Sequence, residues 1–204
     1  MFSNILELNG LSVEILSVLS YKSELGISLK KNLHYFDEKS LLNELYKMAD
    51  SYSCQMLLDN IPIDFRIKSK ESIIAKYKRY YPEHQARKVF NDILGFRAFC
   101  DSYTDILKLE SDEFKIVDLT SGKSNDDGYR GVHVYYQKDN NHYPIEIQFN
   151  TLYDRQLNNW LHDYLYKKPY ATSIGKYIRE EYENGRIRNI IEFKEVLNNV
   201  LSNC

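Results

Sequence analysis

The sequence has few cysteines, no long apolar run and almost no excess charge of either sign. Its three cysteines, Cys54, Cys100 and Cys204, are an odd number and lack the short spacing of a metal-binding motif. Nothing resembling a signal peptide precedes them, and no apolar stretch approaches the roughly 18 residues that a membrane-spanning helix needs. We therefore expect a cytoplasmic protein with reduced cysteines and no membrane role.

The net charge of −2 offers no overall attraction to nucleic acid, so any such contact must come from a local basic patch. Hydrophobic residues make up 43% of the chain and charged residues 27%, which is ordinary for a globular protein and argues against disorder. With 204 residues and no internal repeat or low-complexity linker, residues 1–204 are predicted to form a single domain.

Hydrophobic spacing predicts helices interleaved with strands. The first sixty residues have a mainly helical pattern, with Leu42, Leu45 and Met48 on one face. An extended segment at 63–68 then leads into a basic helix. Strands are predicted at 93–101, 114–120, 131–137 and 143–150, followed by helices at 152–168 and 187–201. This order predicts an α/β or α+β fold, with a mixed β-sheet flanked by N- and C-terminal helices.

Alternation along the last two predicted strands places polar side chains on one face. In 145–150, three apolar residues alternate with Glu146, Gln148 and an asparagine, so one face of the strand can enter the core. If the valines of 131–136 also join the core, His133 lies on the same side as Glu146. The ordinary alternative is a solvated outer face that carries a histidine of no catalytic meaning.

A basic cluster stands where the predicted basic helix begins. Its members are Arg66, Lys68, Ser72 and Lys76. The first two project from one side of an extended segment and the last two lie one helical turn apart, so all four can face one polyanion. Converging cations are what a triphosphate requires, because they replace its hydration and counterions. The alternative is an ordinary solvated charged face.

Asp92 and Arg97 bracket the start of a buried strand. An unpaired guanidinium would be costly within that strand, so Arg97 needs a carboxylate, a phosphate or a stacked base as its partner. Asp92 and Glu146 could meet at the strand ends as ligands of Mg²⁺, which takes one or two carboxylates plus substrate phosphates. The alternative is a pair of unrelated surface acids.

Taken in order, "RIKSKESIIAK", "NDILGFR", "GYRGVH" and "EIQFNT" resemble the synthetase domain of the RelA/SpoT family, in particular its small alarmone synthetases. The resemblance covers a motif core from about residue 62 to 168, roughly half of the chain. It implies a nucleotidyltransferase-like synthetase fold. It also implies an ATP-dependent pyrophosphokinase, which transfers the β,γ-pyrophosphate of ATP to a ribose 3′-hydroxyl and releases AMP.

The resemblance also implies donor-side roles. Arg66 and Arg97 would sandwich the adenine of ATP, while the donor phosphates would be held by Lys68, Ser72 and Lys76. The expected catalytic residues are Glu146, Asp92 and His133, of which Asp92 and Glu146 would bind Mg²⁺. Glu146 is either the base that takes the acceptor's proton or only a metal ligand.

On the acceptor side, the residues expected to bind are Lys123, Tyr129, Arg130 and Gln148. The ring of Tyr129 would stack on the acceptor base, and Gly128 would allow the turn that precedes it. His133, with Gln148 nearby, would contact a phosphate or the reacting ribose.

Three departures from the family's motifs fall on this acceptor side. The last motif usually reads "EIQIRT", whereas Asn150 replaces the arginine here, and Gly131 replaces the serine of "GYxS". Arg155 stands where an asparagine of the guanine-reading pocket is expected. Since the donor side is intact, we expect an enzyme that uses ATP but modifies a different acceptor. The resemblance includes a toxin branch that pyrophosphorylates the 3′ CCA end of tRNA, and we favour that acceptor.

Two alternatives stay open: synthesis of (p)ppGpp from GDP or GTP, and a nucleotide- or RNA-binding regulator without turnover. A tRNA acceptor requires a local basic surface, because phosphate contacts dominate nucleic-acid affinity. Candidates are Lys30 and Lys31, together with Lys22, or Arg186 and Arg188, and their alternative role is solubilising charge. An antitoxin protein and a homo-oligomer are further partners that the resemblance allows.

Overall fold

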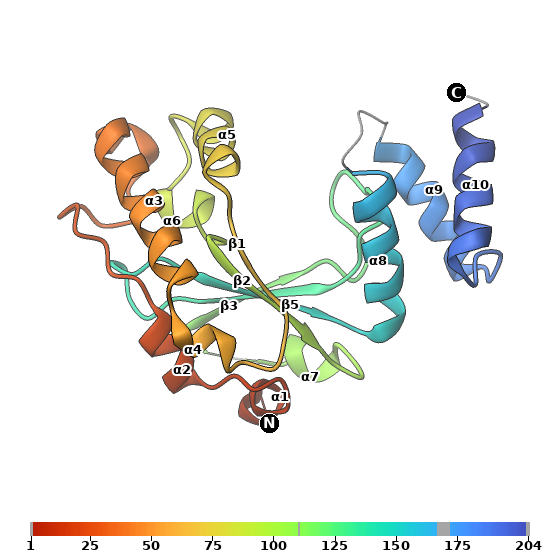
Figure 1. Ribbon diagram of the computed structural model, residues 1–204, viewed down its shortest axis with the longest axis horizontal. Coiled ribbons are helices and arrows are strands. Elements are labelled where there is room, and N and C mark those ends of the chain that lie inside the picture. Colours follow the sequence, from red (N-terminus) through yellow and green to blue (C-terminus); the bar gives the residue numbers. More distant parts are fainter. Residues whose placement is uncertain (1, 110, 167–171, 203–204) are drawn as a thin grey trace. The chain divides into compact units, whose positions relative to one another are not determined.

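In a computed structural model, which describes residues 2–109, 111–166 and 172–202, the strands form one five-stranded sheet (Figure 1). The strands are β1 (Phe65–Ile67), β2 (Leu94–Phe99), β3 (Phe114–Asp118), β4 (Val132–Tyr136) and β5 (Ile145–Asn150). Their order in the sheet is β1-β2-β5-β4-β3. Each predicted strand is found, shortened by two or three residues. Cys204 and the end of predicted helix 152–168 lie outside the described residues.

The sheet is mixed, as predicted. Strands β1 and β2 pair antiparallel, with Arg66 opposite Gly95. Strand β5 runs parallel to β2, because Gly95 lies next to Glu146 near the start of both strands and the N–H of Cys100 donates to the carbonyl of Asn150 at their ends. A buried β2–β5 pair at the centre of the sheet holds the polar side chains of both strands on one face.

The helices flank this sheet at both ends of the chain. They are α1 (Phe2–Leu8), α2 (Val13–Leu19), α3 (Glu38–Ser53), α4 (Met56–Asp59), α5 (Lys70–Tyr80), α6 (Ala86–Val89), α7 (Thr104–Leu107), α8 (Leu152–Tyr164), α9 (Thr172–Glu183) and α10 (Ile190–Ser202), with a 3₁₀ turn η1 (Leu33–Tyr35). Among the described helices none is by itself long and apolar enough to cross a membrane, and only α1 with α2, as a pair bent by 68°, meets the length and composition of a span.

The prediction of a mainly helical N-terminus is wrong for residues 20–37, which are irregular apart from η1. Their backbone bonds to distant segments instead: the N–H of Ser23 donates to the carbonyl of Asn141, and the N–H of Leu29 to that of Asn140. These partners are distant in sequence, so no local spacing reveals them. In α3 the fully buried face carries Leu41 rather than the predicted Leu42, together with Leu45 and Met48.

The chain divides into two compact units. The first comprises residues 1–98, 105–116 and 133–148. In it, α3 packs beside α5 (Figure 1). A buried carboxylate, Glu44 of α3, ties the irregular segment down: its Oε1 accepts from the hydroxyls of Ser23 at 2.7 Å and Tyr143 at 2.8 Å, and its Oε2 accepts from the N–H of Glu24. With these donors the buried charge is fully hydrogen-bonded.

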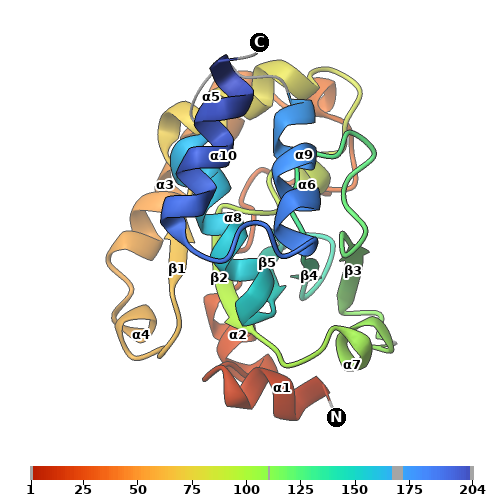
Figure 2. The ribbon, with the colours of Figure 1, turned by 90° about the vertical axis from the view of Figure 1, so that its right-hand side faces the viewer.

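The second unit comprises residues 99–104, 117–132 and 149–204. Its helices α8, α9 and α10 lie side by side (Figures 1 and 2). Their apolar faces form one core, which includes Leu157, Leu161, Ile178, Tyr182 and Phe193. Helix α9 has no counterpart among the predicted elements. The prediction that residues 1–204 form a single domain stays a prediction.

Candidate active site

A polar cavity on the first unit gathers most of the residues expected on the donor side. It is lined by Arg66, Lys68, Asp92, Gly95, Arg97, Glu146 and Gln148. Five of these residues lie in strands β1, β2 and β5, and Lys68 directly follows β1. Side chains alternate between the two faces of a strand, so the polar ones share one face. On the opposite face Phe96, Ala98 and Ile147 are completely buried. The apolar face therefore fixes the strands that carry the polar one.

Asp92 lies between two lysines. The ammonium group of Lys68 is 2.6 Å from Oδ2 and that of Lys76 is 3.0 Å from Oδ1. Burial lowers the pKa of Lys68 below its ordinary value, although the charge of Asp92 acts in the opposite direction. Ser72, which was expected to hold donor phosphates, receives a hydrogen bond from the hydroxyl of Ser69 at the start of α5 and does not line the cavity.

Glu146 is only 7% exposed and accepts three polar contacts. Tyr135 donates its hydroxyl to Oε1 at 2.9 Å, Gln148 donates its amide to Oε2 at 2.7 Å, and Nδ1 of His133 lies 3.2 Å from Oε1. The predicted shared face of His133 and Glu146 is therefore found. Burial acts to raise the pKa of Glu146, but these three partners outweigh it and hold the pKa below its ordinary value. A carboxylate held ionised in this way suits a cation better than a proton.

Arg66 and Arg97 reach the same cavity from neighbouring strands. Within the described ranges neither guanidinium forms an ion pair, and Arg97 is half-buried. The partner that the sequence requires for Arg97 is thus not a carboxylate of the described chain. Two planar cations that line a cavity are suited to stack on an aromatic base or to bind phosphate.

The two carboxylates of the cavity are compatible with a Mg²⁺ ion whose other ligands would come from substrate phosphates. Asp92 and Glu146 both line it, and Mg²⁺ commonly uses one or two carboxylates together with phosphate oxygens. In the part of the chain that the structure describes, no three His, Cys, Asp or Glu side chains form a metal-binding cluster. A divalent ion here would therefore depend on the phosphates that it accompanies.

Residues 121–131, the tyrosine loop, belong to the second unit. Gly128 has a φ of +87°, so the expected turn is present where a glycine is favoured. The ammonium group of Lys123 lies 5.1 Å from the centre of the Tyr129 ring and pairs with Asp127. Tyr129 and Lys123, both expected at the acceptor, thus lie together in this loop.

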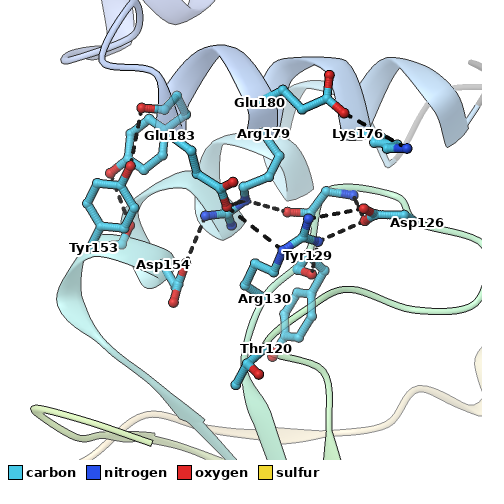
Figure 3. Close-up of polar contacts among 12 residues, drawn as sticks. Thr120, Asp126, Tyr129, Arg130, Tyr153, Asp154, Lys176, Arg179, Glu180 and Glu183 are labelled. Atoms are coloured by element: carbon cyan, nitrogen blue, oxygen red, sulfur yellow. Dashed lines mark hydrogen bonds and ion pairs between the residues drawn. The ribbon is translucent and has the colours of Figure 1, made fainter.

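Arg130 holds the loop rather than standing free. Its guanidinium pairs with both carboxylate oxygens of Asp126, at 2.8 and 3.0 Å, and lowers the pKa of that carboxyl (Figure 3). Its carbonyl accepts from the amides of Asn150 at 2.8 Å and Asn158 at 2.7 Å. A contact of Arg130 with the acceptor stays a prediction, because these bonds give it a structural role of its own.

Two of the departures from the family's motifs, at positions 131 and 150, contact each other. A Cβ atom on Gly131 would lie 2.4 Å from Nδ2 of Asn150, so a serine cannot be accommodated without movement. Asn150 is completely buried. Arg155 is 9% exposed, and its guanidinium lies over the ring of Phe99 at 5.3 Å. The three altered positions are thus built into the second unit's interior.

The candidate tRNA-binding residues are on the surface. Lys30 and Lys31 are exposed in the irregular N-terminal segment, with the Lys31 ammonium group over the ring of Tyr35. Arg186 and Arg188 pair with acidic neighbours, Glu181 and Glu192 respectively. Exposure allows either the functional or the solubilising role.

Sequence reasoning missed two residues that the site depends on. Tyr135 donates to Glu146, and its signal was present, since alternation along β4 places it on the face of His133. Arg179 of α9 is 0% exposed and reaches the tyrosine loop, donating from Nε to the carbonyl of Gly128 at 2.8 Å (Figure 3). No local pattern marked this arginine as buried.

Comparison with known proteins places these features in a family. Residues 65–171 match the family described as "Region found in RelA / SpoT proteins". Similar solved structures include small alarmone synthetase 1 from Bacillus subtilis bound to its product pppGpp, which is 26% identical, with 62% of this chain and 79% of that chain covered and a TM-score of 0.38.

Small alarmone synthetase 2 from Bacillus subtilis is 21% identical, with 79% of this chain and 97% of that chain covered and a TM-score of 0.43. A GTP pyrophosphokinase family protein from Streptococcus pneumoniae is 22% identical, with 81% of this chain and 88% of that chain covered and a TM-score of 0.37. No curated protein matches the sequence.

Proposed function

Because the chain belongs to the RelA/SpoT family of pyrophosphokinases, we propose that it transfers the β,γ-pyrophosphate of ATP to a ribose 3′-hydroxyl and releases AMP. The observation that carries this proposal is the single cavity in which two arginines, a lysine and two carboxylates converge. Phosphoryl transfer depends mainly on positioning and on charge neutralisation, and this cavity offers fixed charges of both signs.

On the donor side, Arg66 and Arg97 would lie against the adenine, and Lys68 and Lys76 would hold the phosphates. Asp92 balances the two lysines before ATP binds, at 2.6 and 3.0 Å. A phosphate beside Lys68 would favour its charged form and so offset the effect of burial. The lysines would then exchange a carboxylate partner for the donor phosphates.

Asp92 and Glu146 are the residues that would hold Mg²⁺. The ion would neutralise charge on the phosphates and on the leaving AMP oxygen. Glu146 stays ionised because His133, Tyr135 and Gln148 all contact its carboxylate. This favours its role as a ligand, and His133 on the same face is the second candidate for the group that accepts the acceptor's proton.

For the acceptor, we favour the 3′ end of tRNA over GDP or GTP. The family's usual arginine is replaced by Asn150, which is completely buried and hydrogen-bonded to the backbone of Arg130. Arg155 replaces an asparagine of the guanine-reading pocket and lies over Phe99. The asparagine expected to read guanine is thus missing, whereas stacking on Tyr129 tolerates any base. The alternative acceptor, GDP or GTP, would yield (p)ppGpp.

The experiment that decides is a transfer assay with γ-labelled ATP and either deacylated tRNA or GDP and GTP. Label in tRNA alone supports our acceptor, and label in guanosine nucleotides alone supports the alternative. Glu146→Gln, which keeps the shape of the side chain, should lower AMP release at least about a hundredfold. If the wild type releases no AMP with any acceptor, the chain is a nucleotide- or RNA-binding regulator instead.

A tRNA acceptor should also depend on Lys30 and Lys31, which are exposed. Replacing both by alanine should raise the KM for tRNA and flatten its salt dependence, while the KM for ATP is unchanged. A matched control replaces Lys108 and Lys115, two exposed lysines of the same unit. An equal effect of both pairs would remove the case for a specific tRNA surface.

The acceptor proposal extends to the cell. A protein that blocks the 3′ end of tRNA should arrest growth when its expression is induced, and a neighbouring antitoxin gene should relieve the arrest. Normal growth during induction of a protein that is active in the transfer assay would contradict the toxin role.

A further inference from the structure

Arg179 is a fully buried cation that no step of the proposed chemistry uses. It is 0% exposed and lies on α9. Three of its N–H groups have separate acceptors. Nη1 donates to Asp154 at 2.7 Å (Figure 3), Nε to the carbonyl of Gly128 at 2.8 Å, and Nη2 to Asn158 at 3.0 Å. These donors sit on three different nitrogens of one planar fork, whereas the three donors of a lysine radiate from a single nitrogen, so a lysine cannot reproduce the arrangement.

These bonds belong to a larger set that fixes the backbone around Tyr129. Each of the four backbone carbonyls of residues 127–130 accepts a hydrogen bond from a side chain. The donors are Tyr166 to residue 127, Arg179 to residue 128, Arg130 to residue 129, and both Asn150 and Asn158 to residue 130. Apart from Arg130, every donor lies on strand β5 or on the C-terminal helices or their ends. The loop is therefore held in one conformation by side chains that are distant from it in sequence.

Helix α9 also approaches the loop backbone directly. A Cβ atom on Gly128 would lie 2.2 Å from the carbonyl oxygen of Gly175, and one on Gly175 would lie closer still to the carbonyl oxygen of Asp127. Two glycines facing each other allow a contact that no other residue type could make. This contact brings the backbone of α9 against the residue that precedes Tyr129.

We propose that Arg179 is a positioning residue for the acceptor: it fixes the carbonyl of Gly128 and thereby sets where the ring of Tyr129 presents its stacking face. Helix α9 begins at Thr172, whereas the match to the family ends at residue 171. The chain's own C-terminal segment thus controls a loop that lies within the family region. The inference rests on the proposed function only in taking Tyr129 as the acceptor-stacking residue.

The test is Arg179→Lys, which keeps the positive charge and removes the planar guanidinium group. The KM for the acceptor, measured with deacylated tRNA and with GTP, should rise at least about tenfold, because a small misplacement of a binding group is costly. The KM for ATP should stay within about twofold. The matched control is Arg79→Lys, at an exposed arginine of α5 outside the second unit, which should change neither constant. A rise in the KM for ATP equal to that for the acceptor would overturn the proposal, as would no change in either.

A double variant shows whether Arg179 acts through Tyr129. In a Tyr129→Ala background, Arg179→Lys should have little further effect on the acceptor KM, because the group that it positions is gone. A full and additive loss in that background would mean that Arg179 acts by another route and would overturn the proposal.

Folding is followed by Trp160, the only tryptophan, whose ring lies 5.5 Å from Phe193 in the core of the second unit. If Arg179→Lys shifts the emission to the red, the same measurements are made with Asp154→Asn, which keeps the shape of the arginine's partner. A selective rise in acceptor KM in either folded variant supports the proposal. If both variants unfold, Arg179 is a folding residue and the proposal is wrong.

Amide exchange separates this inference from the proposed function. In Arg179→Lys, the amides of 121–131 should exchange faster, while those of α8 are unchanged. If the wild type transfers label to neither acceptor, the proposed function fails, and exchange alone then decides whether Arg179 fixes the loop. If transfer occurs but loop exchange is unaltered, the positioning role fails and the proposed function stands.

Discussion

Asn150 fills the space that a side chain at position 131 would need. Its Nδ2 is 2.4 Å from the position of a Cβ on Gly131 and donates to the carbonyl of Arg130 at 2.8 Å. Two departures from the family's motifs therefore form one packing unit, in which a small residue accommodates a buried amide. Because Asn158 donates to the same carbonyl, the loop keeps one bond if Asn150 is shortened.

We predict that Gly131→Ser destabilises the protein by about 1–3 kcal/mol, because the added atoms overpack a closed site. Asn150→Ala should relieve part of this loss, so the double variant should be more stable than the sum of the single effects by at least about 1 kcal/mol. Urea denaturation of the four proteins measures the coupling. Asn159→Ala, at an exposed position, is the control and should give no relief. Additive effects of Gly131→Ser and Asn150→Ala would contradict the packing unit.

At the scale of single residues, we also expect two of the cysteines, Cys54 and Cys100, to react with alkylating reagents at different rates. Burial raises the pKa of Cys100 to about 12, whereas Cys54 is exposed at the end of α3. Since the thiolate is the reactive form, only about one Cys100 in 10⁴ is ionised at pH 8. In a Cys204→Ser background, iodoacetamide at pH 8 should modify Cys54 at least about a hundredfold faster than Cys100, as followed by peptide mass. Comparable rates would contradict the burial of Cys100.

At the scale of elements, the strands were predictable and two segments were not. Apolar and polar residues alternate along β4 and β5, and this local pattern sets the face of each side chain. Residues 20–37 depend on Glu44 and on the β4–β5 turn, which are distant in sequence. Helix α9 carries a buried arginine, Arg179, whose partners lie on α8 and in the tyrosine loop. Because a charged residue is normally expected at the surface, the sequence did not indicate that this side of the helix is buried. Long-range polar contacts leave no periodicity to read.

The same reason limited the prediction of the candidate site. Arg66, Lys68, Asp92 and Glu146 were found from motifs, and all four line one cavity. Tyr135 was missed although its face was predicted, because an aromatic residue on a strand is usually a packing residue. The residues that line the cavity were thus predictable from motifs, whereas the residues that hold them by hydrogen bonds were not.

Glu44 should be the residue that most strongly holds the N-terminal segment. Glu44→Ala removes the acceptor of Ser23, Glu24 and Tyr143, and unpaired buried donors are costly, so we predict a loss of about 3 kcal/mol in the free energy of unfolding. Asn43→Ala, at the exposed neighbouring position, should cost less than about 0.5 kcal/mol. Urea denaturation measures both, and amide exchange in residues 20–37 should rise only in Glu44→Ala. A loss no greater than that of the control would contradict this role.

At the scale of the whole molecule, the two units share their strands. Strands β2, β3, β4 and β5 each contribute residues to both units. Breaking either unit therefore interrupts strands of the other, and the hydrogen bonds between strands are lost together. That residues 1–204 are one folding domain stays a prediction, which the coupling between the units can test.

We predict that both units unfold in a single urea transition. Trp160 reports on the second unit, and a fluorophore on the exposed Cys54 reports on the first, in a Cys204→Ser background. If shared strands couple the units, the two probes should give the same midpoint and the same dependence on denaturant, as a two-state transition requires.

Phe193→Ala should then lower the midpoint seen by both probes, because the cavity left in the second core removes about 3–5 kcal/mol from one common equilibrium. Separate midpoints, or a change confined to Trp160, would mean that the units fold independently. The donor cavity could then persist while the tyrosine loop is unfolded, and ATP binding without transfer would be its signature.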